Sequence, residues 1–150
     1  MKVYTVYWIK NEFAEHYYYK SDILYRFLRE FHAKYNRNDL VTQFNFITES
    51  FPKEQLSSQL TRLQQNTFRN QAKRNPIELG NTINYITLHI NEKHLKFRCE
   101  TLEDAEALLF PILRRFHPYL FIMDEENENY GWISPVRTSI AYNNEEVLYS

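Results

Sequence analysis

The segment that decides the fold is Val3-Tyr4-Thr5-Val6-Tyr7-Trp8-Ile9, close to the start of the chain. Nearly all of its residues are β-branched or aromatic, and such residues favour strands. Side chains alternate between the two faces of a strand, and here both alternating sets are largely apolar. The segment therefore predicts a strand that the rest of the protein covers on both faces.

Two helices are predicted directly after this strand. Asn11–Tyr19 has the length of a short helix, which Asn11 can cap at its N-terminus. Ser21 can cap a longer helix over residues 22–35, whose apolar positions follow the i, i+1, i+4, i+5, i+8 spacing of an amphipathic helix. Helices are therefore expected in the first connection of the sheet.

The rest of the chain predicts a sheet with further helices in its connections. The expected elements are a strand over 40–48 with Phe44 and Phe46 on one face, a helix over 52–65, an exposed loop over 64–80, strands over 82–90 and 94–100, a helix over 101–116, and strands over 119–124 and 130–134. In the helix over 101–116, Pro111 should kink or divide the helix, and an apolar stripe should face the sheet: Ala105, Leu108, Ile112 and Phe116.

This order of elements predicts one α+β domain over residues 1–137, with a mostly antiparallel sheet of about five to six strands packed with about four helices. Residues 138–150 read as a frayed C-terminal tail.

Composition excludes several classes of protein. The 150 residues carry a net charge of −1, with two glycines and one cysteine. Two glycines cannot form a Gly-rich phosphate-binding loop, and the single Cys99 excludes an internal disulfide framework or a CxxC zinc pair. The longest stretch without charged residues, 79–91, is studded with Asn, Thr and His, so no membrane helix is expected. We expect a cytoplasmic protein that is monomeric in the absence of a partner.

Neither a catalytic nor a metal site is predicted. The five histidines are scattered without metal-ligand spacing: His16, His32, His89, His94 and His117. The acidic run 124–129 lacks the glycine and the bidentate glutamate of a calcium loop, and is interpreted as a solvated turn. The interpretation is a non-enzyme without catalytic residues, metal or other cofactors.

Phe13 and Tyr17 lie four residues apart and therefore share one face of the short helix. They can pack inward with the core. They can also form an exposed aromatic pair, which is how a protein-binding hot spot looks. Residues 62–74 offer a different kind of site, because they are basic with an interleaved aromatic: Arg62, Phe68, Arg69, Lys73 and Arg74. A nucleic-acid-binding accessory protein that uses this loop is the alternative function.

Both ends of the chain resemble a known family. The N-terminal pattern is Tyr4-x-x-Tyr7-x-Ile9-Lys10-x-Glu12-Phe13-Ala14-x-His16-Tyr17, and the C-terminal one is Met123-Asp124 followed by Tyr130-Gly131-Trp132-x-x-Pro135-Val136. These motifs resemble the sporulation inhibitor of replication (SirA) proteins of endospore-forming Firmicutes. The resemblance spans about residues 3–137. Pro111 departs from it, since the equivalent helix normally runs unbroken.

The resemblance implies a non-enzymatic regulator that binds the N-terminal domain of the replication initiator DnaA and blocks new rounds of chromosome replication at the onset of sporulation. It implies no direct contact with nucleic acid. It also implies that the aromatic residues at the positions of Phe13 and Tyr17 contact the partner, which favours the exposed pair. The expected partner-binding residues are Phe13 and Tyr17 with their neighbours Glu12, Ala14 and His16.

Overall fold

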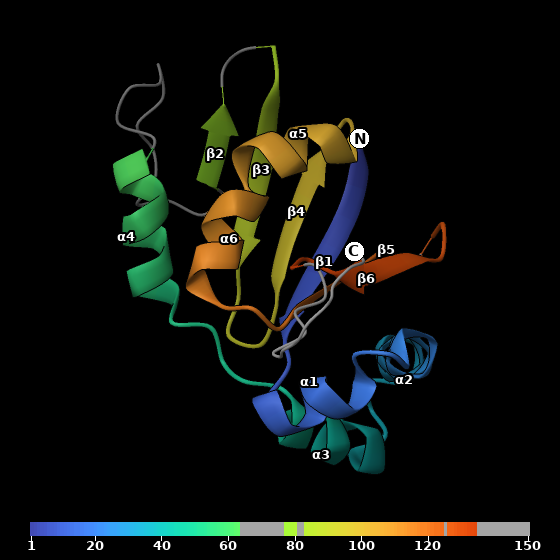
Figure 1. Cartoon of the computed structure of the whole chain (residues 1–150). Helices are drawn as coiled ribbons and strands as arrows, with labels where there is room; N and C mark the ends of the chain where they lie inside the picture. The colour runs from blue at the N-terminus through green and yellow to red at the C-terminus, as the bar shows by residue number, and fades with distance from the viewer. Residues whose placement is uncertain (64–76, 81–82, 125, 135–150) are drawn as a thin grey trace, which may run out of the picture.

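The computed structural model describes residues 1–63, 77–80, 83–124 and 126–134 (Figure 1). Within this part of the chain there are six strands and six helices. The strands are β1 (Lys2–Trp8), β2 (Ile77–Gly80), β3 (Tyr85–Ile90), β4 (Leu95–Cys99), β5 (Leu120–Asp124) and β6 (Asn129–Trp132). The helices are α1 (Asn11–Tyr17), α2 (Ser21–Ala33), α3 (Asn38–Ile47), α4 (Lys53–Leu63), α5 (Leu102–Leu108) and α6 (Phe110–Phe116).

The six strands form one sheet in the order β2-β3-β4-β1-β5-β6, in which every neighbouring pair is antiparallel. β1 lies inside the sheet, with Tyr4 opposite Phe97 of β4 and Tyr7 opposite Phe121 of β5. The predicted α+β class and the antiparallel sheet are confirmed. The described chain has six helices where about four were expected.

Two hydrophobic cores lie on opposite faces of this sheet, because the side chains of β1 alternate between them. Tyr4 and Val6 belong to the first core, which α4, α5 and α6 cover. Tyr7 and Ile9 belong to the second core, together with residues of α1, α2 and α3. In Figure 1 these two sets of helices lie on different sides of β1. The expected covering of the first strand on both faces is confirmed.

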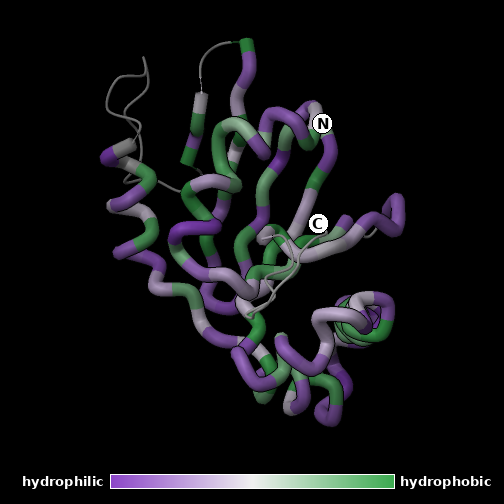
Figure 2. Tube along the Cα trace, viewed as in Figure 1, coloured by the Kyte–Doolittle hydropathy of each residue, from purple (hydrophilic) through white to green (hydrophobic). Residues whose placement is uncertain are grey.

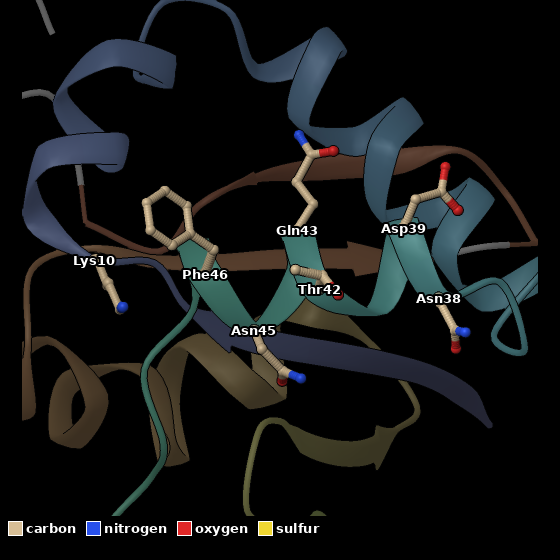
Figure 3. Close-up of a pocket in the computed structure, with 7 residues that line it drawn as sticks. All are labelled: Lys10, Asn38, Asp39, Thr42, Gln43, Asn45 and Phe46. Atoms are coloured by element: carbon tan, nitrogen blue, oxygen red, sulfur yellow. The ribbon is translucent and has the colours of Figure 1, made fainter.

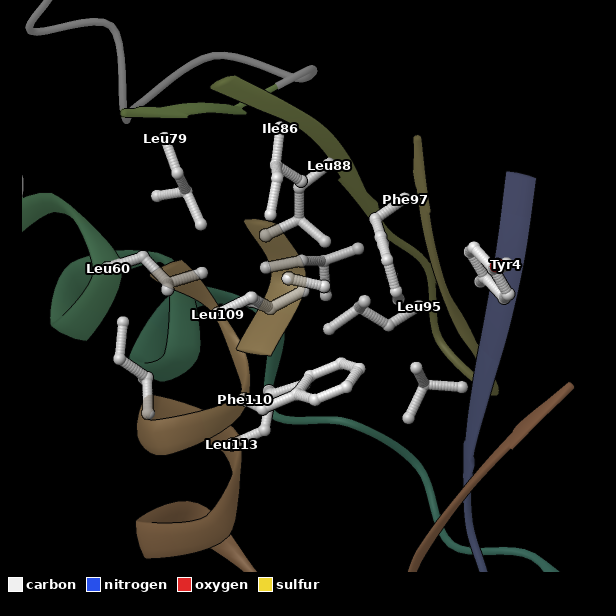
Figure 4. Close-up of a cluster of buried hydrophobic side chains, with 14 of the residues drawn as sticks. Tyr4, Leu60, Leu79, Ile86, Leu88, Leu95, Phe97, Leu109, Phe110 and Leu113 are labelled. Atoms are coloured by element: carbon white, nitrogen blue, oxygen red, sulfur yellow. The ribbon is translucent and has the colours of Figure 1, made fainter. Parts of the chain in front are cut away.

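The first core is the larger one. Figure 4 shows its side chains converging between the sheet and the helices α4 and α6. Ala105 and Ile112 are buried, and Leu108 and Phe116 are half-buried against the same core, so the predicted stripe faces the sheet. Pro111 stands in the first turn of α6, and the predicted division of the helix is confirmed. A proline is tolerated in a first turn because its missing N–H has no helical partner there.

The predicted strand over 40–48 is wrong, because Asn38–Ile47 forms the helix α3. Its buried residues are Leu40, Phe44 and Ile47, and their spacing of four and three residues is that of one helix face. Phe44 and Phe46 do not share a face. Residues two apart on a helix point about 200° away from each other, so Phe44 packs in the second core while Phe46 is 61% exposed.

The predicted loop over 64–80 is wrong at its end, where Ile77–Gly80 forms the edge strand β2. Residues 64–76 and the expected tail 138–150 lie outside the described residues.

Gly80 has a φ of +104°, and a Cβ there would lie 2.2 Å from the carbonyl oxygen of Asn84. Glycine is therefore required at Gly80. Gly131, in contrast, has open space around it and an ordinary φ, so its position does not require glycine.

Figure 2 shows hydrophilic residues around the turn between β5 and β6, and hydrophobic residues that alternate with hydrophilic ones along β4. In the part of the chain that is described, no helix combines the length and the apolar character needed to cross a bilayer.

Candidate functional site

The short helix α1 follows β1 at the edge of the second core. Ile9 forms a bridge with Thr48 after α3, and the N–H of Lys10 donates to the carbonyl of Ile47 at 2.9 Å. These contacts hold the start of α1 against the end of α3. Lys10 rather than Asn11 is the N-cap residue, and no side chain caps the helix. The expected capping by Asn11 is therefore wrong by one position.

The residues expected to bind the partner lie on different faces of α1. Ala14 is completely buried in the second core. Phe13 and Tyr17 are half-buried on the flank of the helix and pack against the same core, while Glu12 and His16 are exposed. The aromatic pair is therefore partly exposed and also packs inward, so each of the two expected arrangements holds in part. Its role in binding stays a prediction.

Ala14 needs a correction, because the fold covers its side chain. Its side chain is completely buried in the second core, so a partner cannot contact it. A larger residue at this position would push α1 away from the sheet, which makes Ala14 a packing residue. Glu12, Phe13, His16 and Tyr17 are the predicted residues that a partner can reach.

Ring contacts fix the directions of the exposed aromatic side chains. The ring of His16 meets the ring of Tyr17 edge-on with centroids 4.9 Å apart. Phe13 meets Phe46 of α3 in the same T-shaped manner at 5.2 Å. Such pairs stabilise a defined side-chain geometry. Sequence reasoning missed Phe46 as a neighbour of the site, since the predicted strand placed it beside Phe44.

Trp132, from the C-terminal motif, supports this corner of the fold. Its ring stacks on Tyr18 with centroids 5.1 Å apart and meets Phe121 edge-on at the same distance. The hydroxyl of Tyr18 donates to the carbonyl of Ser134 at 2.9 Å. Residues of both sequence motifs meet in the second core, where Tyr7 and Ala14 pack together with Met123 and Trp132.

Other candidate groups are engaged inside the fold. Nε2 of His32 is hydrogen-bonded to the buried hydroxyl of Tyr7, and burial lowers the pKa of His94 and of His117. Burial raises the pKa of the Cys99 thiol to about 11, which disfavours its reactive thiolate. The carboxylate of Asp124 is buried and accepts hydrogen bonds from the turn that follows it.

Among the residues that the structure describes, no three His, Cys, Asp or Glu side chains are grouped so that they could hold a metal ion. Arg62 is exposed near the end of α4. Phe68, Arg69, Lys73 and Arg74, which carry the alternative nucleic-acid site, lie outside the described residues.

The described residues form an α+β fold in which the short helix α1 displays half-exposed aromatic side chains beside the polar side chains of Glu12 and His16. The chain belongs to the SirA family, because the family model described as sporulation inhibitor of replication protein SirA matches residues 2–137. A relative from Bacillus subtilis (strain 168), the sporulation inhibitor of replication protein SirA, is 25% identical over 139 residues, which cover 89% of this chain and 94% of the relative.

Proposed function

We propose that this protein is a non-enzymatic inhibitor of chromosome replication that acts in the cytoplasm at the onset of sporulation. The family match over residues 2–137 supports the inhibition of replication and the link to sporulation. The name of the relative from Bacillus subtilis agrees with both.

The proposed partner is the N-terminal domain of the replication initiator DnaA, and the proposed contact is the aromatic flank of α1. The observation that carries this proposal is the half-exposure of Phe13 and Tyr17 on one face of a helix that Ala14 anchors in the core. Buried anchoring keeps the exposed rings rigid, which lowers the entropic cost of binding. Glu12 and His16 supply a polar rim.

The mechanism is occupancy. The inhibitor covers a surface that the initiator needs for its own assembly or for other regulators, so no bond is made or broken. A rigid patch on a folded domain suffices for this task, and an interface of this kind depends on a few aromatic anchors. The chain acts as a monomer in this proposal.

A pull-down on the immobilised N-terminal domain of DnaA tests the proposal. The wild-type chain should be retained, and Phe13→Ala and Tyr17→Ala should each weaken retention by about thirtyfold in apparent affinity. Tyr85→Ala is the matched control, because Tyr85 is 37% exposed on β3, away from α1.

Melting curves of the four proteins exclude unfolding as the cause of any loss. Retention that disappears in high salt but survives both α1 variants would contradict the proposal and favour phosphate-type contacts by the basic loop. No retention of the wild type would also contradict it.

A further inference from the structure

The helices of the second core cover only part of the sheet. That core takes its strand residues from β1, β5 and β6, and among the described residues none from β2, β3 or β4 contributes to it. Figure 1 shows α1, α2 and α3 at the lower end of the molecule, away from β2 and β3. An antiparallel sheet can leave one face to solvent. Here the open face, on the side away from α5 and α6, belongs to β2, β3, β4 and the start of β1.

Two cations of β4 stand in one row on this open face. Leu95, Phe97 and Cys99 are buried in the first core. Because side chains alternate along a strand, Lys96 and Arg98 point to the opposite face, and both are exposed. Residues two apart in a strand are separated by about 6.7 Å. Within the described residues neither cation forms an ion pair.

The nearest carboxylates of this face are separated from the two cations. Glu78 of β2 is opposite Thr87 of β3, which is itself opposite Arg98, so Glu78 lies two strands away from Arg98. Neighbouring strands are about 4.8 Å apart, which puts about 10 Å between the two backbones. Glu100 follows beyond the end of β4. The open face therefore presents positive charge that is not paired with a carboxylate.

Apolar side chains flank the cations. Val3 of β1 is opposite Arg98 and is 38% exposed. Tyr85 of β3 lies on the same face, two residues before Thr87, and is 37% exposed. A face that is only solvated is polar at its outward positions. Exposed tyrosine and arginine beside aliphatic surface are instead typical of a protein-binding face.

We propose that the open sheet face binds an acidic segment of another protein in an extended conformation. Alternate carboxylates of such a segment are about 6.7 Å apart, which matches the spacing of Lys96 and Arg98. An apolar side chain at the next alternate position covers the surface of Val3 and Tyr85. The aliphatic contact at Val3 favours a polypeptide, since single-stranded nucleic acid depends on aromatic rings for stacking.

This surface is separate from the proposed site on α1 and does not depend on it. The pocket beside α1 lies along α3, where Lys10 and Phe46 line it (Figure 3). The cations of the open face belong to β4, and its apolar residues belong to β1 and β3. Charge reversal on β4 should therefore leave retention on the N-terminal domain of DnaA unchanged.

Fluorescence anisotropy of the full chain with a labelled peptide tests the inference. The probe repeats the unit Glu-Ser-Glu-Ser-Leu-Ser, so that its carboxylates and leucines share one face of the extended peptide. One matched peptide has lysine in place of glutamate, and another has serine in place of leucine. The acidic probe should bind saturably, the lysine peptide should not bind, and loss of leucine should weaken binding by about threefold or more.

Variants of the protein place the binding on the open face. Lys96→Glu combined with Arg98→Glu should weaken binding of the acidic probe by about tenfold or more, because it sets like charges against each other. Lys53→Glu combined with Arg115→Glu is the matched control, since it changes the net charge equally at exposed residues of α4 and α6. Val3→Thr keeps the β-branched shape and should weaken binding by about threefold. Melting temperatures should stay within about 2 °C of the wild type.

Several results would overturn the inference. Absence of saturable binding by the wild type would do so, and so would equal losses in the two double variants, because they would indicate attraction by net charge alone. Equal affinity for the peptide without leucine would refute the apolar contact. Tighter binding of oligothymidylate that depends on Lys96 and Arg98 would assign the face to nucleic acid instead. Failure of the wild type to bind the N-terminal domain of DnaA, with the peptide still bound, would refute only the proposed function.

Discussion

The assignment of α3 predicts opposite outcomes for two phenylalanines that stand two residues apart. Phe44 is 4% exposed, stacks on Phe31 with ring centroids 4.1 Å apart and meets the edge of Tyr7 at 5.7 Å. Truncating such a ring removes its burial and leaves a cavity, so Phe44→Ala should lower the free energy of unfolding by about 3–5 kcal/mol. Phe46 is 61% exposed, and Phe46→Ala should cost about 0.5 kcal/mol.

For a domain of this size, the loss at Phe44 corresponds to a melting temperature lower by about 6–20 °C. Urea denaturation followed by circular dichroism measures both variants with the same probe, and each serves as the control for the other. Equal losses would contradict the helical assignment of α3, because they would place both rings on one face of a strand. A larger loss for Phe46→Ala would refute it as well.

Two further predictions concern stability. Burial lowers the pKa of His94 and of His117 below 6.5. Below about pH 6.5 the unfolded chain therefore binds more protons than the folded protein. The contribution of the two neutral histidines to stability should be fully present above about pH 6.5 and should fall as the pH drops below that value. Melting temperatures at about pH 7.5 and about pH 5.5 measure this difference, which His94→Gln should reduce; a difference that His94→Gln leaves unchanged would contradict the role of His94. Gly80→Ala should destabilise the fold by more than about 1 kcal/mol, because its Cβ would lie 2.2 Å from the carbonyl oxygen of Asn84 at a positive φ. Gly131→Ala, in open space, is the matched control and should be neutral or stabilising by about 0.4–1 kcal/mol; equal effects of the two substitutions in urea denaturation would refute the argument.

Five of the six strands could be predicted from the sequence because their signals are local, whereas β2 was expected to be part of a loop. The alternation of apolar side chains between the two faces of β1, for example, lies within the strand that it defines. Helix starts were less accurate, since Asn11 and Ser21 lie one residue inside their helices. Such shifts are common, because the N-cap depends on backbone angles that several neighbouring residues can adopt.

The segment 40–48 could not be assigned from the sequence, because nine residues are too few to separate two periods. Phe44 and Phe46 fit the period of two of a strand, while Leu40, Phe44 and Ile47 fit a helix. The burial against α2 and β1 decides between them, and it depends on contacts distant in the sequence. The candidate site could be predicted only in part for the same reason, because some of its contacts join residues that are distant in the sequence. The shared face of Phe13 and Tyr17 follows from their spacing, whereas the contact of Phe13 with Phe46 exists only in the folded protein.

The proposed site on α1 can be located directly by amide hydrogen–deuterium exchange of the full chain, measured with and without the N-terminal domain of DnaA. Binding through α1 should slow exchange in the peptide that spans α1, residues 11–17, and leave the peptide of β3, residues 85–90, unchanged. Unchanged exchange across α1 at a saturating concentration of the domain, or protection confined to other elements, would contradict a binding site on α1.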